Sequence, residues 1–478
     1  MIQILNGIFQ IIFSLFEALF NGISELILSA TPSKRKETYN ADFLPVTKLL
    51  SASQKGFCLS GDKSLSIEES FSNAIAFGGS GSGKTSSLLL PSIYKMAGGS
   101  SLVVHDPSGE LYLKSSQYMF NQGYAVKVLN YTQTEISEEY NPLSRITTLS
   151  DIKKIAKLLI QTSLGGGGKD PFWNESASNI LTLFIRYVIF HTGEKYHTLS
   201  YVLSLINDCS GSPKKVDTLI VETKDESLLA EYKSFVGYDS KMLMSIVATT
   251  QTALALFADP EIATITKADT INFTDFRKQK TILYINNDIN NLKYYSVLSS
   301  LFFEQFFASI MKQLPTTNDL PIFFLLDESS SLYLNILPIA ISNIRKYNAG
   351  MLQIYQSQSQ LFDLYGMAQG RNILANSYAK CYLPGQPLET ARELQSILGS
   401  FEYVDENETK RTRPLLTMDE IRILKEAIIL LGNHPAVKTK LIPYYEHTQF
   451  KHCAHLPPYS IPKKGIVEDM KRADETEA

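Results

Sequence analysis

A glycine-rich octapeptide at residues 78–85 offers the clearest chemistry in the sequence. Its letters, GGSGSGKT, fit the pattern G-x-x-x-x-G-K-[ST]. Glycines allow the backbone turns that aim N–H groups at a phosphate, Lys84 carries a positive charge to the outer phosphates, and Thr85 offers a hydroxyl to Mg²⁺. Because an apolar run precedes the octapeptide and a helical pattern follows it, we predict a nucleotide-binding loop rather than a flexible linker. The residues expected to contact the nucleotide are Gly78, Gly79, Ser80, Gly81, Ser82, Gly83, Lys84, Thr85 and Ser86.

Two adjacent acids, Asp327 and Glu328, supply a second element that nucleotide chemistry requires. The apolar run IFFLL precedes them and predicts a buried strand that ends at these carboxylates. We expect Asp327, together with Thr85, to hold Mg²⁺, and Glu328 to polarise the attacking water. Adjacent Asp and Glu favour hydrolysis over transfer to a small acceptor. The sequence therefore favours an ATPase that uses ATP and Mg²⁺ over a small-molecule kinase.

A glutamine and an arginine complete the candidate catalytic set. The strand-like stretch GMLQIYQ ends at Gln356, where a neighbouring strand would bring an amide toward the γ-phosphate. Gln358 and Gln360 follow, and the sequence leaves open which of the three glutamines takes this role. Arg345 lies between the acids and the glutamine, where an arginine can reach the nucleotide of an adjacent subunit, as an arginine finger does. The alternative is an arginine on a helix surface. The candidate catalytic residues are Lys84, Asp327, Glu328, Gln356 and Arg345.

Short apolar runs alternate with helical patterns on both sides of these residues. This βαβ order predicts an α/β fold in which helices cover a parallel sheet. Between residues 151 and 270 the apolar residues are spaced by three or four, which predicts an all-α domain inserted between early and late strands of one sheet. We therefore assign residues 45–150 and 271–455 to a nucleotide-binding domain, 151–270 to an all-α domain, 31–44 to a linker and 456–478 to a flexible tail.

Composition restricts the class of protein. The chain has 478 residues, too many for one ordinary core, and its 44% apolar and 19% charged residues exclude a largely disordered protein. The net charge is only −3, so contacts with nucleic acid must be local or created by assembly. The four cysteines lie far apart without a CxxC pair, which indicates a reduced, cytosolic body without a zinc site.

The N-terminal segment, 1–30, differs from the rest of the chain. It is apolar, but polar residues recur every three to four positions, which places these on one stripe of a helix. This pattern predicts an amphipathic or membrane-anchoring helix that lies in the membrane interface or spans the membrane. An amphipathic helix packed on the body or on a partner is the alternative. If the helix spans, the basic triplet at residues 34–36 would hold the following body in the cytoplasm.

Taken in order, several stretches over residues 45–450 resemble the coupling proteins of type IV secretion, the TraG/TraD-like conjugative DNA-transfer ATPases. The resemblance implies a RecA-like P-loop NTPase domain with an inserted all-α domain, assembled as a homohexamer. It also implies an ATPase, stimulated by DNA, that delivers relaxase-bound single-stranded DNA to the secretion channel at the cytoplasmic face of the bacterial inner membrane. The stretches are GGSGSGKTSSLLLPS, VVHDPSGELY, YNPL, PFWNESASNILTLFI, FFLLDESSSLYLNILPIAISNIRKYNAGMLQIYQSQSQL, ILANSYAKCYLPG, ETARELQSILG, RPLLTMDEIRIL and PYYE.

The resemblance assigns the same roles as the residue chemistry to the lysine and threonine of the loop, the two acids, Gln356 and Arg345. It adds Asp106, in HDPSGE, as an acidic position whose role the sequence does not define. Many family members carry two N-terminal spanning helices, whereas this chain has one candidate. The sequence also leaves open a second function, a membrane-docked receptor that binds relaxase or effector proteins and uses ATP as an assembly switch rather than to drive a DNA motor.

Overall fold

The computed structural model describes residues 40–164 and 171–463. The predicted N-terminal helix and its basic triplet, most of the predicted linker and the stretch 464–478 of the predicted tail lie outside the described residues. The described residues divide into two compact units, one containing 43–398 and 416–463 and the other containing 40–42 and 399–415.

A nine-stranded sheet forms the centre of the first unit, with strand order β11-β10-β7-β1-β6-β5-β2-β4-β3. From β7 to β3 all neighbouring strands are parallel, whereas β10 pairs antiparallel with β7 and β11 antiparallel with β10. The parallel strands are short apolar runs because both faces of the sheet are covered. The strands are β1 (Ala74–Phe77), β2 (Ser101–His105), β3 (Ala125–Asn130), β4 (Thr281–Asn286), β5 (Ile322–Leu326), β6 (Ala349–Tyr355), β7 (Ala379–Tyr382), β10 (Ala427–Leu431) and β11 (Val437–Thr439).

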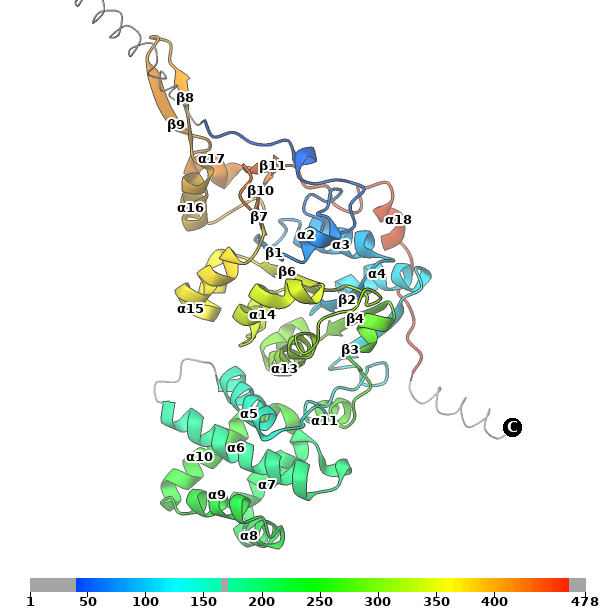
Figure 1. The fold of residues 1–478 in the computed structure, drawn as a ribbon, viewed down its shortest axis with the longest axis vertical. Coiled ribbons are helices and arrows are strands. Elements are labelled where there is room, and N and C mark those ends of the chain that lie inside the picture. Colours follow the sequence, from blue (N-terminus) through cyan, green and yellow to red (C-terminus); the bar gives the residue numbers. More distant parts are fainter. Residues whose placement is uncertain (1–39, 165–170, 464–478) are drawn as a thin grey trace, which may run out of the picture. The chain divides into compact units, whose positions relative to one another are not determined.

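Helices cover both faces of this sheet (Figure 1), and consecutive residues of β5 show how. Phe323 stacks on Phe71 and meets Phe57 edge-on, on the face that also buries α3 and α4. Phe324 points to the opposite face and contacts Phe307 of α13. Side chains alternate along a strand, so an unbroken apolar run supplies both cores at once. The helices of this unit outside the insertion are α2 (Ile67–Ser70), α3 (Leu90–Met96), α4 (Glu110–Asn121), α12 (Asp275–Lys278), α13 (Leu292–Ile310), α14 (Leu337–Asn343), α15 (Gln358–Ala375), α16 (Leu388–Leu398), α17 (Met418–Ile423) and α18 (Phe450–Ala454).

An all-α insertion lies between β3 and β4, as the sequence predicted. Its longest helices carry apolar stripes that pack against one another, and α5 also contacts α13. Within the described residues, only Ser240–Ala258, which contains α10, is long and apolar enough to cross a membrane, and α10 packs against its neighbours in the insertion. The insertion comprises α5 (Leu149–Leu164), α6 (Pro171–His191), α7 (Leu199–Gly211), α8 (Pro213–Glu222), α9 (Glu226–Val236), α10 (Ser240–Leu254) and α11 (Pro260–Ile265).

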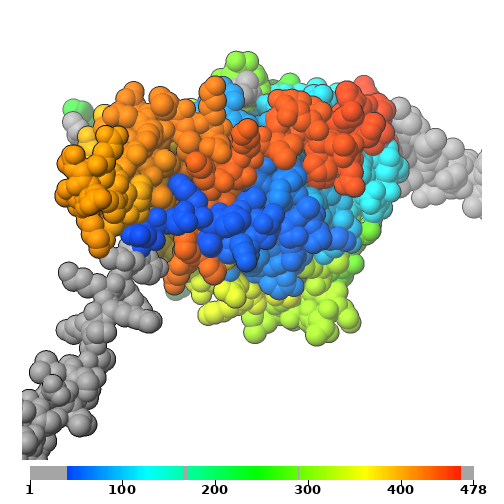
Figure 2. Space-filling model, turned by 90° about the horizontal axis from the view of Figure 1, so that it is seen from above, coloured from blue at the N-terminus to red at the C-terminus, as the bar shows by residue number. Residues whose placement is uncertain are grey.

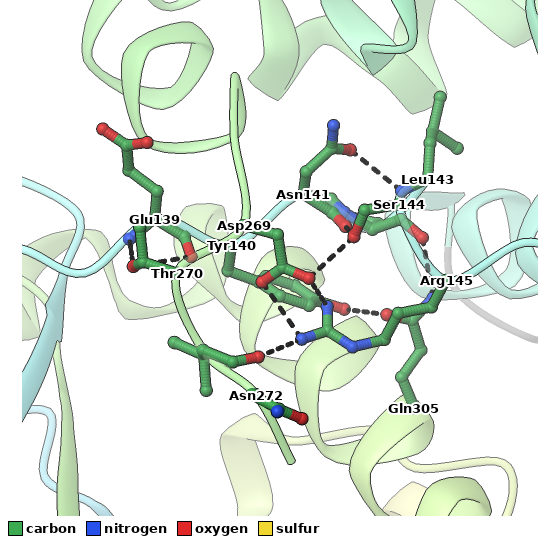
Figure 3. A network of polar contacts seen from close by, with 12 residues as sticks. Glu139, Tyr140, Asn141, Leu143, Ser144, Arg145, Asp269, Thr270, Asn272 and Gln305 are labelled. Carbon is green, nitrogen blue, oxygen red and sulfur yellow. Dashed lines mark hydrogen bonds and ion pairs between the residues drawn. The ribbon is translucent and has the colours of Figure 1, made fainter. Parts of the chain in front are cut away.

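The two connections to the insertion are fastened to each other by Arg145 (Figure 3). Its guanidinium pairs with both carboxylate oxygens of Asp269, at 2.5 and 3.0 Å, and lies 3.9 Å from the centre of the Phe273 ring. The Tyr140 hydroxyl donates to Gln305 of α13 at 2.7 Å. A bidentate arginine pair that also stacks on a ring holds both partners in a defined geometry. The insertion is thus tied to α13, which packs on the sheet.

The second unit contains a two-stranded hairpin that the sequence analysis did not separate from the nucleotide domain. Its strands are β8 (Ser400–Val404) and β9 (Lys410–Pro414). The N–H of Ala41 donates to the carbonyl of Ser400 at 3.1 Å, and the Asn40 side chain accepts from the N–H of Glu402 at 3.0 Å. An isolated hairpin is marginally stable, and these bonds give its first strand an additional partner.

Residues 456–463, which the sequence analysis placed in the tail, contact α4. The Tyr459 ring stacks on Phe120 with centroids 4.4 Å apart, and its N–H donates to the Ser116 hydroxyl at 3.0 Å. The sequence carries no periodicity here because the segment is held by single aromatic and hydrogen-bonding contacts rather than by an amphipathic face.

Candidate nucleotide-binding site

The predicted phosphate loop follows β1 and leads into a π-helical turn, Lys84–Leu89, that continues into α3. Gly81 and Gly83 have φ values of 76° and 96°, a left-handed conformation that favours glycine. At Gly78 an added Cβ would come within 2.4 Å of the Ser82 hydroxyl and 2.9 Å of Leu383 Cβ. The Lys84 ammonium bends back over the loop and donates to the carbonyls of residues 78 and 79, at 2.8 and 2.9 Å. The glycine loop, the Lys84 ammonium and the Thr85 hydroxyl together fit a nucleoside triphosphate with Mg²⁺.

Asp327 and Glu328 lie at the carboxyl end of β5. The His105 ring, which burial keeps neutral by lowering its pKa to about 4, shares a 2.6 Å hydrogen bond with the Asp327 carbonyl. Burial, and then the neighbouring charge of Glu328, raise the pKa of Asp327 to about 6, while the charge of Lys84 lowers it. The loop lysine and the acidic strand are therefore electrostatically coupled. Glu328 has φ 49° and ψ 51°, a left-handed conformation that is uncommon for a non-glycine residue and is concentrated at functional sites.

The structure places Asp106 beside the acidic pair, which the sequence did not predict. Strand β2 lies beside β5 with His105 opposite Leu326, so the next residues, Asp106 and Asp327, stand side by side at the strand ends. Asp106 is fully buried, and its carboxylate accepts the N–H of Tyr112 at 2.8 Å, which fixes the first turn of α4 to the sheet. Burial raises the pKa of Asp106 from 3.8 to about 7.

Replacing Asp106 with Asn should stabilise the protein, and the gain should grow as the pH rises from 4 to 7. The folded carboxyl keeps its proton up to about pH 7, whereas the unfolded carboxyl loses it near 3.8. At this position the folded wild type therefore binds more protons than the unfolded chain in this window, so the contribution of Asp106 to stability falls as pH rises. The asparagine oxygen can still accept the N–H of Tyr112. The gain amounts to at most about 1.4 kcal/mol for each pH unit of the window.

Denaturant unfolding of nucleotide-free protein at several pH values measures this gain. The exposed Asp363 on α15 is the matched control, and Asp363→Asn should change the free energy of unfolding only slightly. An Asp106→Asn difference that stays constant across the window would contradict the assignment.

The structure distinguishes the three candidate glutamines. The Gln356 side chain donates to a Glu328 carboxylate oxygen at 2.8 Å. The Gln360 side chain accepts the backbone N–H of Gln356 at 2.9 Å, and Gln358 is buried at the first turn of α15. Among the three, Gln356 alone contacts a candidate catalytic acid. Gln356 directly follows β6, which pairs with β5, so its amide lies near the carboxyl end of β5.

Arg345 lies away from the phosphate loop of its own chain. It belongs to a short 3₁₀ turn, Ile344–Tyr347, immediately before β6, whereas the loop, the acids and Gln356 follow the carboxyl ends of β1, β5 and β6. The seven residues of β6, about 23 Å at ~3.3 Å each, lie between the Arg345 turn and the carboxyl ends of the strands. Arg345 is exposed, and the part of the chain that the structure describes gives its guanidinium no hydrogen bond or ion pair.

Arg277, which no sequence motif indicates, holds the Arg345 turn in place. Its guanidinium donates to the carbonyls of Leu320 and Asn348, at 2.9 and 3.2 Å, and to that of Tyr347. Burial lowers the pKa of Arg277 to about 10. In the sequence, Arg277 belongs to the stretch DFRK of α12, just before β4, and this stretch matches no recognisable motif.

Comparison with known families decides the assignment of the chain. Residues 25–466 match the family described as type IV secretory system conjugative DNA transfer. The chain belongs to this family. It is 25% identical to the protein VirD4 of Rhizobium radiobacter over 80% of this chain and 58% of that protein. It is 24% identical to a probable conjugal transfer protein TraG of Sinorhizobium fredii, over 81% and 64%. The chain spans less than two thirds of the length of these relatives.

Solved structures show the same fold. The conjugative coupling protein TrwB, in a trigonal form with sulphate, superposes with a TM-score of 0.70 at 17% identity, over 91% of this chain and 99% of that chain. TrwB in complex with ADP and Mg²⁺ gives a TM-score of 0.68 at 18% identity, over 85% and 94%. The predictions of a RecA-like P-loop fold with an all-α insertion, and of the coupling-protein family, are confirmed.

Proposed function

We propose that this chain is the ATP-hydrolysing coupling protein of a conjugative type IV secretion system, which delivers relaxase-bound single-stranded DNA to the secretion channel. One observation carries the proposal: the phosphate loop, the acidic pair and Gln356 lie together at the carboxyl ends of three neighbouring parallel strands, β1, β6 and β5. Ligands of open α/β sheets bind at this edge. The relatives named VirD4 and TraG, and the TrwB complex with ADP and Mg²⁺, support this function.

ATP hydrolysis at this site would use the residues as follows. Lys84 and the loop N–H groups hold the phosphates, and Thr85 with Asp327 would hold Mg²⁺, which neutralises charge on the phosphates. Glu328 accepts a proton from the attacking water, whose oxygen bonds to the γ-phosphorus as the bond to ADP breaks. Gln356, held 2.8 Å from Glu328, orients the water and senses the γ-phosphate.

Assembly as a homohexamer would complete the site. Arg345 lies at the amino end of β6, whereas its own phosphate loop follows the carboxyl end of β1. It can therefore act on a nucleotide only if that nucleotide is bound by another subunit. A permanently charged, planar guanidinium stabilises the charge that develops during phosphoryl transfer. In such a ring, one chain's Arg345 would lie beside the adjacent chain's γ-phosphate.

The partners and location of the protein follow from the same proposal. We place the protein at the cytoplasmic face of the bacterial inner membrane, anchored peripherally or by one span through its N-terminal segment, 1–30. Relaxosome proteins would present the DNA, and channel proteins would accept it. If ATP serves only as an assembly switch, the protein is instead a membrane-docked substrate receptor, and its turnover is independent of DNA.

ATP binding and turnover by purified wild-type protein and by Lys84→Ala test the proposal. Wild-type protein should bind and hydrolyse ATP, and Lys84→Ala should lose turnover and bind ATP far more weakly, because the phosphates lose their cation. Thermal unfolding confirms that the variant is folded. Equal turnover in the two proteins would remove the phosphate loop from the reaction.

A further inference from the structure

The PYYE stretch near the C-terminus passes directly beside the phosphate loop. Leu441 Cδ1 lies 3.6 Å from the position that a Cβ on Gly83 would take. Three residues later, the N–H of Tyr444 donates to the carbonyl of Ser86 at 2.8 Å. Successive residues of this segment therefore contact the end of the loop and then the first turn of the helix that follows it.

The same segment also packs closely against residues 60 and 61. The N–H of Ile442 donates to the Ser60 carbonyl at 3.0 Å, and a Cβ on Gly61 would come within 1.9 Å of the Ile442 carbonyl oxygen. Figure 2 shows the orange-red segment after residue 430 lying against the blue residues near the start of this unit. The backbone that carries Tyr444 and Tyr445 is thus fixed next to the nucleotide site.

The sheet order sets the direction in which a bound nucleotide runs. The acids and Gln356 follow β5 and β6, on one side of β1, and this is the γ-phosphate end of the proposed site. The ribose and base must leave the loop away from these residues. Segment 440–446 comes from β11, which lies on the other side of β1, and reaches the helix turn one residue after Thr85. The base therefore emerges where this segment crosses.

The chemistry of the segment suits a base. Tyr445 is 56% exposed, and its ring meets the ring of Tyr444 at 5.3 Å and 79°, an edge-to-face contact that limits its rotation. An exposed aromatic face stacks on nucleobases without reading their edges. We propose that Tyr445, held edge-on by Tyr444, is a stacking platform for the purine base of the nucleotide at the phosphate loop. The proposal rests on the proposed ATPase function and adds that the site accepts adenine and guanine alike. TrwB has been solved with both an ATP and a GTP analogue.

Equilibrium binding of three probes to the full chain tests the platform: ATP, GTP and inorganic triphosphate, which has no base. Tyr445→Ala should weaken the binding of ATP and of GTP by about tenfold each, the typical loss of one base stack, and leave triphosphate binding unchanged. Tyr445→Phe keeps the ring and should bind all three as the wild type does. Tyr238→Ala, at an exposed tyrosine of the all-α insertion, is the matched control and should change none of them.

Each outcome decides between the alternatives. Unchanged ATP affinity in Tyr445→Ala would overturn the platform, as would an equal loss for triphosphate, which would show that the substitution disturbs the loop itself. If Tyr445→Ala weakened the binding of ATP but not of GTP, the proposal that the platform accepts adenine and guanine alike would be wrong. If wild-type protein bound none of the probes, the proposed ATPase function would fail instead, so the two failures are distinguishable.

Discussion

Glu328→Gln should bind ATP as tightly as the wild type and hydrolyse it about 10²- to 10⁴-fold more slowly, the range that a positioned general base contributes. The substitution removes the proton acceptor but keeps an oxygen for the amide of Gln356, which lies 2.8 Å away. Glutamine has the same side-chain length and branching as glutamate, so it should fit the left-handed backbone of position 328 equally well. Binding affinity and single-turnover hydrolysis, measured on the same protein, separate the two effects.

Glu408→Gln is the matched control for this experiment. Glu408 is an exposed glutamate with φ 60° in the hairpin turn, so it has the same chemistry and a similar backbone conformation away from the site. It should leave turnover unchanged. If Glu328→Gln lost ATP binding instead of turnover, Glu328 would be needed to shape the site rather than to activate water.

Arg345→Ala should keep ATP affinity nearly intact and lower turnover by roughly a thousandfold or more, as removal of an arginine finger does. Arg345 lies beyond the amino end of β6, whereas its own phosphate loop lies at the carboxyl end of β1, so the lost charge belongs to a neighbour's site. Turnover of the wild type should accordingly rise more steeply than linearly with protein concentration while the ring assembles. Arg371→Ala, at an exposed arginine on α15, should retain wild-type turnover.

Mixing Arg345→Ala with Lys84→Ala subunits tests the action across the interface. Each variant alone is expected to be inactive, but a mixed ring can pair an intact phosphate loop with an intact arginine from the adjacent subunit. Activity should therefore return on mixing. Native mass measurement confirms that mixed rings form, and mixed rings without activity would remove Arg345 from this role.

The sequence predicted those parts of the site whose residues are adjacent in the chain. Residues 78–85 and the pair at 327–328 carry their chemistry in their spacing, because a phosphate loop and an acidic strand end are local structures. The β-α alternation likewise predicted the sheet, and the spacing of apolar residues by three or four predicted the inserted helices. These features needed no knowledge of which strands are neighbours.

The rest depends on contacts between distant residues. Asp106 stands beside Asp327 only because β2 pairs with β5, and the choice of Gln356 over Gln360 depends on side-chain direction at the end of β6. Tyr444 lies beside the loop because segment 440–446 contacts residues near the start of this unit's sequence, at Ser60, Gly61, Gly83 and Ser86. No local pattern in a single sequence records such pairings.

The rate of ATP hydrolysis against added single-stranded DNA, at fixed salt and several protein concentrations, tests the central claim most directly. The account predicts that single-stranded DNA raises the turnover of the wild type, that the rise weakens as salt increases because DNA contacts are screened, and that Lys84→Ala shows no turnover at any DNA concentration. ATP turnover that is insensitive to DNA in assembled protein would contradict a DNA-coupled ATPase and favour the receptor that uses ATP as a switch.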